Sequence, residues 1–490
     1  MQNRYDLVVI GAGPGGTPVA IEYAKLNSKK RVALIDVLGE LGGECLFQGC
    51  IPSKIMEASA KHITEIKNLE EFGINLESKH YDLVWDKIKS RKEEILAKRT
   101  LGVKELADSV ENIEIIKGFA YFQSSESIRV MLGDDRSRVI SFEKALIATG
   151  SKANVAPYTG NAVDEVMTND KFFKDMELPN SLSIIGSGAI AIEFTQILAN
   201  LGVEINLFVR GNKILKNIDS EASEYLLKTM QKHPNINLLL NSNVTAVNHK
   251  DELLEITYIQ DDIRKTLLCQ KVLSAIGRKS NIEKLELENA EVAFTQKGIT
   301  TSTSLQTSNK NIFANGDVVE NFPKFAHTAQ YTAHILAQNL FLEHNFFKPD
   351  FTKNSWVLFS MPNFASAGIL EEEAKKKELD VIVDKFDFST EAKSQIENED
   401  FGYLKFIVEK SSYKIIGISI FHDEANVLAG EAALIVAQKV TLKELIDTIH
   451  PHPTMSEAFV MLAKQMMGKI MIEKLSNPVV QVLLTIEKLI

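Results

Sequence analysis

The sequence has few cysteines, no long apolar run and no excess of basic residues. Only three of its 490 residues are cysteine, which favours a reducing compartment over a disulfide-stabilised secreted scaffold. No uncharged apolar run reaches the ~18 residues of a membrane-spanning helix, and no secretory leader is recognised. The 55 Lys and Arg against 65 Asp and Glu give a formal net charge of −10, which argues against nucleic acid as a partner. These absences predict a cytoplasmic protein without a transmembrane segment.

The sequence does have length and an ordinary globular composition. At 490 residues, 45% hydrophobic and 24% charged, the chain is too long for one compact core, and about three domains are expected. Two of its cysteines, Cys45 and Cys50, lie close together in the stretch Gly-Gly-Glu-Cys-Leu-Phe-Gln-Gly-Cys-Ile-Pro-Ser-Lys at 42–54. A thiol pair this close in a chain this long indicates chemistry more than a structural staple.

The spacing of the two cysteines constrains the backbone. Residues i and i+5 of a regular helix project to different sides, whereas a disulfide needs its Cα atoms about 4.4–6.8 Å apart. The chain must therefore be irregular around Gly49, and Pro52 suits the first turn of a helix. The alternative is two buried structural cysteines. We interpret the pair as a redox-active dithiol at the start of a distorted helix.

A dinucleotide-binding pattern precedes the dithiol. An apolar strand is predicted over 6–10, a helix through Ala20 to Leu26, and a second strand over 31–35. Between the first strand and the helix stand Gly11, Gly13 and Gly16, which fit G-x-G-x-x-G in its strand–turn–helix context. Asp36 ends the second strand, where it can accept hydrogen bonds from a ribose, although a plain turn residue is the alternative. Because the dithiol follows this unit directly, the expected dinucleotide is the redox cofactor FAD.

The same pattern returns later in the chain. A predicted strand over 182–185 is followed by Gly186 and Gly188, with Ala191 in the third glycine position, and by another strand over 203–209. Between the two units, charged periodic sequence over about 57–106 predicts long surface helices, and a strand over about 139–150 ends on Ala148-Thr149-Gly150. Two such units predict two dinucleotides, one held tightly and one exchanging.

The end of the second unit bears on the choice of nicotinamide. Where an NAD site carries an acid for the ribose, the sequence reads Phe208-Val209-Arg210, with Lys213 and Lys216 following. An arginine there can pair with a 2′-phosphate, so NADPH is favoured and NADH stays open. The alternative interpretation is a solvated basic loop.

With these motifs in place, the sequence resembles the flavin-dependent pyridine nucleotide–disulfide oxidoreductases over nearly its whole length. Later landmarks also match: Ser-Ala-Ile-Gly-Arg at 274–278, Ile-Phe-Ala-Asn-Gly-Asp at 312–317 and His-Pro-His-Pro-Thr-Met-Ser-Glu at 450–457. The resemblance implies an α/β fold with two Rossmann-like domains and a C-terminal α+β dimerisation domain. It places the FAD-binding domain at 1–152 and 273–344, the NAD(P)-binding domain at 153–272 and the dimerisation domain at 345–490.

The resemblance also implies roles for individual residues. Cys45 would be the interchange thiol that meets the substrate, and Cys50 the thiolate against the flavin. Lys54 would lie beside the flavin's reactive nitrogen, with Glu193 as its ion-pair partner. The residues expected at FAD are Gly11, Gly13, Gly16, Asp36, Thr149, Gly150, Asp317 and Ala326, and those expected at NAD(P) are Gly186, Gly188, Arg210, Lys216 and Gly277. No metal site is expected.

His452 would be the acid–base catalyst, oriented by Glu457. A thiol nucleophile needs a neighbour that accepts and returns a proton near neutral pH, and histidine does so without perturbation. A histidine that only fills a turn between two prolines is the alternative. In the family this histidine reaches the cysteines of the other subunit, so a homodimer with shared active sites is implied.

The substrate is less constrained than the fold. The Cys-Ile-Pro-Ser-Lys motif and the His-Pro-Thr-x-x-Glu ending are similar to the lipoamide-oxidising members, whose lipoyl partner belongs to a 2-oxo acid dehydrogenase complex. Arg210 is instead similar to the glutathione-reducing members. A mercuric-reductase-like paralogue is disfavoured because no cysteine pair lies near the C-terminus. Cys269, in an apolar run, is expected to be a small buried residue. The apolar tail 479–490 is expected to pack on the dimer, with a membrane surface or a partner as the alternative.

Overall fold

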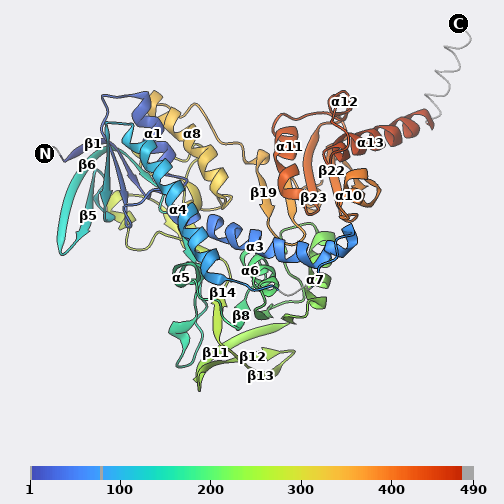
Figure 1. Ribbon diagram of the computed structural model, residues 1–490. Coiled ribbons are helices and arrows are strands. Elements are labelled where there is room, and N and C mark those ends of the chain that lie inside the picture. The colour runs from blue at the N-terminus through green and yellow to red at the C-terminus, as the bar shows by residue number, and fades with distance from the viewer. Residues whose placement is uncertain (1–2, 78–80, 477–490) are drawn as a thin grey trace, which may run out of the picture. The chain divides into compact units, whose positions relative to one another are not determined.

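The computed structural model describes residues 3–77 and 81–476, and the chain divides into two compact units (Figure 1). The first unit comprises Met1–Asn212 and His233–Asp350, and the second comprises Lys213–Lys232 and Phe351–Ile490. No helix of the described residues is long and apolar enough to cross a bilayer. The expected tail at 479–490 lies outside the described residues.

The first sheet of the first unit is the predicted dinucleotide-binding sheet. Its strand order is β3-β2-β1-β6-β5-β4, with β18 paired to β6. The bounds are β1 Arg4–Ile10, β2 Val32–Asp36, β3 Ile113–Lys117, β4 Phe119–Ser124, β5 Ser127–Gly133, β6 Arg136–Ile147 and β18 Ile312–Ala314. Strands β3, β2, β1, β6 and β18 pair in parallel. Leu7, Val8 and Val9 are completely buried, as expected for a parallel strand covered on both faces. Helices α1 (Thr17–Leu26) and α8 (Ala326–Leu342) pack together beside this sheet.

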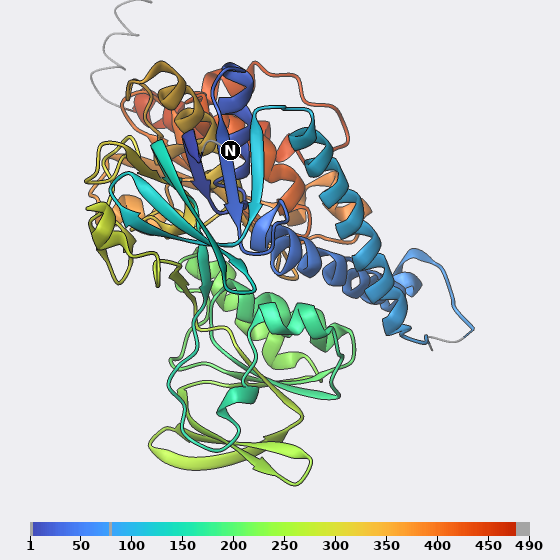
Figure 2. The same ribbon diagram turned by 90° about the vertical axis from the view of Figure 1, so that its left-hand side faces the viewer.

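The second glycine turn belongs to a smaller parallel sheet, drawn in green in Figure 2. Its order is β10-β9-β8-β14, with bounds Ile236–Leu239, Glu204–Phe208, Ser181–Ile185 and Lys271–Ser274. Helix α6 (Ala189–Asn200) follows β8, and the antiparallel strands β11 (Ser242–Lys250), β12 (Leu253–Gln260) and β13 (Ile263–Cys269) form a third sheet. Cys269 is buried in an apolar cluster with Val272 and Leu254, which confirms its expected packing role.

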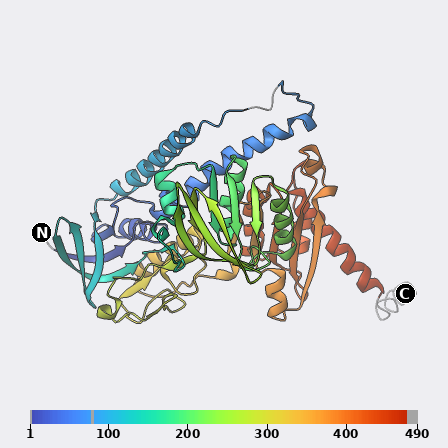
Figure 3. The ribbon, with the colours of Figure 1, turned by 90° about the horizontal axis from the view of Figure 1, so that it is seen from below.

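Two long helices follow the dithiol, as the charged periodic sequence predicted. Helix α3 (Cys50–Asn68) and helix α4 (Trp85–Asp108) pack against each other (Figure 3). The Nε1–H of Trp85 donates to the carbonyl of Met176 at 2.7 Å, and Nζ of Lys92 donates to the carbonyl of Phe173 at 2.9 Å. These bonds attach α4 to the segment around α5 (Asn169–Asp175).

The second unit is built on a five-stranded antiparallel sheet, β19-β20-β23-β22-β21. The strand bounds are Ser355–Leu358, Phe364–Gly368, Ile415–Phe421, Tyr403–Glu409 and Val381–Asp387. Its helices are α7 (Ser220–Lys232), α9 (Glu371–Lys376), α10 (Ala392–Ile396), α11 (Ala425–Ala437), α12 (Leu442–Ile446) and α13 (Glu457–Ser476). Side chains of α11, α12 and α13 form one apolar core with the sheet.

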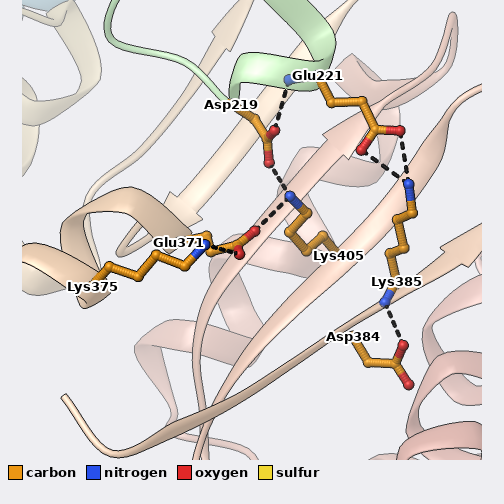
Figure 4. A network of polar contacts seen from close by, with 7 residues as sticks. All are labelled: Asp219, Glu221, Glu371, Lys375, Asp384, Lys385 and Lys405. Atoms are coloured by element: carbon orange, nitrogen blue, oxygen red, sulfur yellow. Dashed lines mark hydrogen bonds and ion pairs between the residues drawn. The ribbon is translucent and has the colours of Figure 1, made fainter. Parts of the chain in front are cut away.

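A buried ion network fastens the segment that carries α7 to this sheet (Figure 4). Lys405, on β22, has a side chain that is only 8% exposed, and its Nζ lies 2.5 Å from Asp219 and 2.8 Å from Glu371. Burial alone would lower the pKa of Lys405, but the hydrogen bonds to Asp219 and Glu371 raise it. The lysine is therefore charged and paired, and the segment 213–232 is held in the second unit.

We expect Lys405→Met to lower the free energy of unfolding of the protein by about 3–5 kcal/mol, because it leaves Asp219 buried without its cation. The matched control is Lys375→Met. Lys375 also binds Glu371, at 2.6 Å, but its side chain is 70% exposed, so its loss is expected to cost under about 1 kcal/mol. Denaturant unfolding of the two variants checks this. Equal stability of the two variants would contradict the ascribed role of Lys405.

Candidate active site

The dithiol lies at a break between two helices. Helix α2 (Gly43–Phe47) contains Cys45, and Cys50 is the first residue of α3. Gly49 interrupts them with φ −136° and ψ −104°, which is the irregularity that the cysteine spacing predicted. This break lets the two thiols lie close enough for each to shift the pKa of the other.

The dithiol segment also packs tightly on the first glycine turn. Gly43 has φ +60°, and a Cβ added to it would come within 2.7 Å of the Cα of Gly13. The amide of Gly42 donates to the carbonyl of Ala12 at 2.8 Å. Glycine at 43 is therefore required by close approach as well as by backbone conformation, and this contact holds the thiols beside the expected cofactor turn.

The pKa values of the two thiols are shifted in opposite directions. The hydrogen bond with Cys50, together with burial, raises the pKa of Cys45. The hydrogen bond from Cys45 lowers the pKa of Cys50, and the positive charge of Lys54 adds to this effect against the opposing effect of burial. The geometry thus stabilises a thiolate at Cys50 and a neutral thiol at Cys45.

Lys54 lies one turn after Cys50 on α3 and joins this helix to α6. Its Nζ is 2.8 Å from Oε2 of Glu193, so the structure brings together the pair that the resemblance named. A third charged group was missed from the sequence. Oε2 of Glu57 is 4.0 Å from the same Nζ, and the side chain of Glu57 is only 16% exposed. The i, i+3 spacing of Lys54 and Glu57 in a predicted helix was the signal that could have found it.

The first glycine turn fits a dinucleotide pyrophosphate. A Cβ on Gly11 would lie 2.3 Å from the carbonyl oxygen of Ala148, and one on Gly16 would lie 2.0 Å from the carbonyl oxygen of Gly11. Above Gly13, by contrast, the nearest atom is 4.0 Å away. The first and third glycines are thus needed for packing, while the second leaves room for a ligand to approach the backbone.

Asp36, at the end of β2, holds the same turn. Its Oδ2 accepts from the amide of Ala12 at 3.0 Å, and its Oδ1 accepts from the amide of Leu38 at 2.9 Å. The carboxylate is therefore fixed by backbone donors beside the turn. Its predicted contact with a ribose stays a prediction.

A polar chain connects the dithiol to the other expected FAD residues. Ser151, directly after Gly150, donates to Oδ2 of Asp317 at 2.6 Å. Arg278 donates through Nε to Oγ of Ser151 at 2.8 Å and forms an ion pair with Glu44. Burial raises the pKa of Glu44 despite this arginine. No local pattern indicates the Arg278–Glu44 pair, because 234 residues separate its members.

The remaining FAD candidates are turn and helix-start positions. Thr149 donates through Oγ1 to the carbonyl of Asn281 at 2.8 Å, and Gly150 has φ +68°. Ala326 is the first residue of α8, where the free amides of a helix N-terminus favour an electron-rich group. Their roles at the cofactor stay predictions.

The second glycine turn has the same construction as the first. A Cβ on Gly186 would lie 2.3 Å from the carbonyl oxygen of Ala275, whereas nothing lies within 4 Å of a Cβ on Gly188 or on Gly277. Arg210 is exposed just past the end of β9 in the first unit, and Lys216 belongs to the second unit. The proposed phosphate contacts of Arg210 and Lys216 stay predictions.

The second unit contains the expected pair of His452 and Glu457 at the start of α13. Nδ1 of His452 lies 3.0 Å from Oε2 of Glu457, and the histidine side chain is 72% exposed. The amide of Thr454 donates to the same carboxylate at 3.1 Å. Although burial opposes it, the Thr454 amide and the His452 ring hold the pKa of Glu457 below its usual range. An ionised Glu457 therefore binds Nδ1 of an exposed imidazole and fixes the orientation of its ring.

A thiol pair packed on a dinucleotide-type glycine turn, with the Lys54–Glu193 pair one helical turn away, defines a flavoprotein disulfide oxidoreductase. The chain belongs to the pyridine nucleotide–disulphide oxidoreductase family: residues 5–333 match its core domain and residues 354–463 match its dimerisation domain. The protein is therefore an FAD-dependent disulfide oxidoreductase that uses NAD(P)H, and the predicted α/β fold with a C-terminal dimerisation domain is confirmed.

Among curated relatives, the chain is 32% identical to dihydrolipoyl dehydrogenase of Geobacillus stearothermophilus over 464 residues, which cover 94% of this chain and 96% of the relative. It is 31% identical to a dihydrolipoyl dehydrogenase of Bacillus subtilis over 464 residues, with the same coverage. Among solved structures, a Cu(II) complex of the HOCl-induced flavoprotein disulfide reductase RclA from Escherichia coli matches with a TM-score of 0.82 at 24% identity, over 95% of this chain and 100% of that one. This last likeness supports the fold alone.

Proposed function

We propose that the protein is a homodimeric dihydrolipoyl dehydrogenase, which oxidises a dihydrolipoyl group and reduces NAD⁺ or NADP⁺. The observation that carries this proposal is that curated relatives of this name align with nearly the whole chain. The Cys45–Cys50 pair, with one stabilised thiolate, supplies the chemistry that such a reaction needs. The lipoyl group would be carried by a 2-oxo acid dehydrogenase complex.

In this reaction the Cys45–Cys50 disulfide accepts two electrons from the substrate dithiol. His452 of the partner subunit takes the proton of one substrate thiol, and the resulting thiolate attacks Sγ of Cys45. The Cys45–Cys50 bond breaks and Cys50 leaves as a thiolate. The second substrate thiol then gives its proton to solvent and displaces Cys45, which takes the proton held by His452 and leaves as a thiol, and the lipoyl disulfide closes. Bound FAD supplies the two-electron relay from the dithiol to the nicotinamide.

The chain's other residues prepare this exchange. Lys54 stabilises the negative charge left on Cys50, and Glu193 fixes the position of Lys54 at 2.8 Å. Glu457 holds His452 in the tautomer whose Nε2 can accept a proton. We propose these roles for the six residues Cys45, Cys50, Lys54, Glu193, His452 and Glu457.

A second candidate is an NADPH-dependent reductase of glutathione or a related disulfide. Arg210 at the end of β9 favours it, since an acid would be expected there for NAD. A mercuric-reductase-like activity has less support, because the sequence has only three cysteines and none lies beyond Cys269. We also propose a cytoplasmic location on the basis of the low cysteine content.

One experiment separates these candidates. Steady-state rates are measured with NADH and NADPH against oxidised lipoamide and oxidised glutathione, and with NAD⁺ and NADP⁺ against dihydrolipoamide. Lipoamide turnover at least about a hundredfold above glutathione turnover supports the lipoyl assignment, and the reverse order supports the second candidate. Retention on an acyltransferase core without turnover of free lipoamide would indicate that the chain is mainly a docking subunit.

Arg210→Glu tests the phosphate contact. We expect the KM for NADPH to rise about tenfold or more while the KM for NADH changes little, because the arginine is expected to pair with the 2′-phosphate alone. The KM for NADH, measured with the same variant, is the control. An unchanged KM for NADPH would show that Arg210 is a solvated loop residue.

A further inference from the structure

Helix α3 carries a carboxyl group that the reaction above does not use. Cys50, Lys54 and Glu57 follow one another at intervals of four and three residues, so they lie on one face of the helix. The side chain of Glu57 is 16% exposed, and its Oε2 is 4.0 Å from Nζ of Lys54. Lys54 is also 2.8 Å from Glu193, on α6. One lysine thus lies between two poorly solvated carboxyl groups.

We propose that Glu57 is a positioning residue that shares Lys54 with Glu193, so that its protonation state sets the positive charge available to the Cys50 thiolate. With Glu57 neutral, Lys54 and Glu193 form a balanced pair. With Glu57 ionised, the group of three carries a net negative charge beside the dithiol. The inference rests on the proposed redox role of Cys45 and Cys50.

Burial and the charges around Glu57 bring the pKa of its carboxyl group close to neutral pH. Burial, opposed by Lys54 and Lys61 and reinforced by Glu193, raises the pKa of Glu57 to about 7. Lys61 lies one turn farther along α3, and the neighbouring α4 faces this stretch through Arg91, whose Nη1 donates to the carbonyl of Ile55 at 3.5 Å. Glu57 is thus neutral at about pH 6 and ionised at about pH 8.

The effect on the dithiol follows from charge and distance. Lys54 lowers the pKa of Cys50 while Glu193 raises it, so a second anion at Lys54 disfavours the thiolate further. Seven residues of helix separate Glu57 from Cys50 by about 10 Å. At the effective dielectric of a partly buried site, one charge at this distance changes the thiolate equilibrium about three- to tenfold. Above neutral pH, ionised Glu57 therefore makes the reduced pair less favoured than it would be beside a neutral residue at this position.

The test is the equilibrium of the dithiol with dithiothreitol in the FAD-loaded dimer. The Cys45–Cys50 bond takes two electrons, Cys45 takes one proton, Cys50 remains a thiolate, and the second proton goes to solvent as dithiothreitol closes to its cyclic disulfide. Samples are quenched in acid, denatured and alkylated. Mass spectrometry then gives the fraction of chains in which Cys45 and Cys50 are reduced. This readout does not depend on turnover.

We expect Glu57→Gln to raise the equilibrium constant for reduction about three- to tenfold at pH 8 and to leave it unchanged at pH 6. The matched control is Glu65→Gln. Glu65 is also on α3, but it is half exposed and paired with His62 at 2.7 Å, so no change is expected at either pH. An equal effect of Glu57→Gln at both pH values would overturn the proposal, since that is the result of a packing change.

A wild-type curve supplies a second test that needs no variant. If the wild-type equilibrium follows a single uninterrupted slope across pH 6–8, Glu57 does not titrate there and the proposal is overturned. Failure of the proposed function looks different. In that case dithiothreitol and oxidised lipoamide would not exchange with the Cys45–Cys50 pair at any pH.

Discussion

Cys50→Ser will retain bound FAD and lose dihydrolipoamide turnover by at least about a thousandfold. A serine cannot form the disulfide that accepts the substrate's electrons, and it cannot serve as the thiolate that the structure stabilises at this position. FAD binding is expected to survive because the glycine turn and Asp36 make no use of the sulfur. The measurements are the flavin absorbance per protomer and steady-state turnover.

Cys269→Ser is the matched control for this substitution. Cys269 is buried, with its Sγ 3.9 Å from the carbonyl oxygen of Leu254, and it lies in an apolar cluster on β13. We expect full turnover in this variant with at most a modest loss of stability. Normal activity in Cys50→Ser would eliminate the dithiol mechanism.

His452→Gln will lower kcat about a hundredfold to ten-thousandfold with FAD still bound. The substitution removes the group proposed to take and return the thiol proton, and such groups contribute about that much to the rate. The exposed His62–Glu65 pair, with 2.7 Å between its atoms, provides a control of the same type. His62→Gln is expected to leave kcat unchanged.

Glu457→Gln extends this test to the group that orients the histidine. The carboxylate accepts from Nδ1 of His452 at 3.0 Å, which leaves Nε2 as the ring atom that can take the substrate proton. A glutamine at this position can also donate to Nδ1 and so favours the wrong tautomer, and we expect kcat to fall about tenfold or more with FAD still bound. An unchanged kcat would separate Glu457 from the proton transfer.

The parts of the site that the sequence predicted are those with local patterns. Gly11, Gly13 and Gly16 lie in one turn, and the Cys45–Cys50 spacing alone required the break that the structure has at Gly49. The Lys54–Glu193 pair was predicted only through the family resemblance. Its members are 139 residues apart, and no periodicity connects them.

The parts that escaped prediction depend on tertiary contacts. Arg278 reaches Glu44 across 234 residues, and Lys405 reaches Asp219 across 186. Asp219 and Lys405 belong to no motif, and the motifs that contain Glu44 and Arg278 give no sign that these two side chains meet in the folded chain. Glu57 was missed for a different reason. Its i, i+3 spacing from Lys54 is a local pattern, but a glutamate in a charged helix gives no sign in the sequence that it is buried.

The central claim is that Cys45 and Cys50 form a second two-electron centre beside FAD. An anaerobic reductive titration tests it most directly. The wild-type dimer is expected to take up twice as many electrons per flavin as the Cys45→Ser variant before the flavin is fully bleached, because the disulfide and the flavin each accept a pair. Equal uptake by the two proteins would contradict the claim.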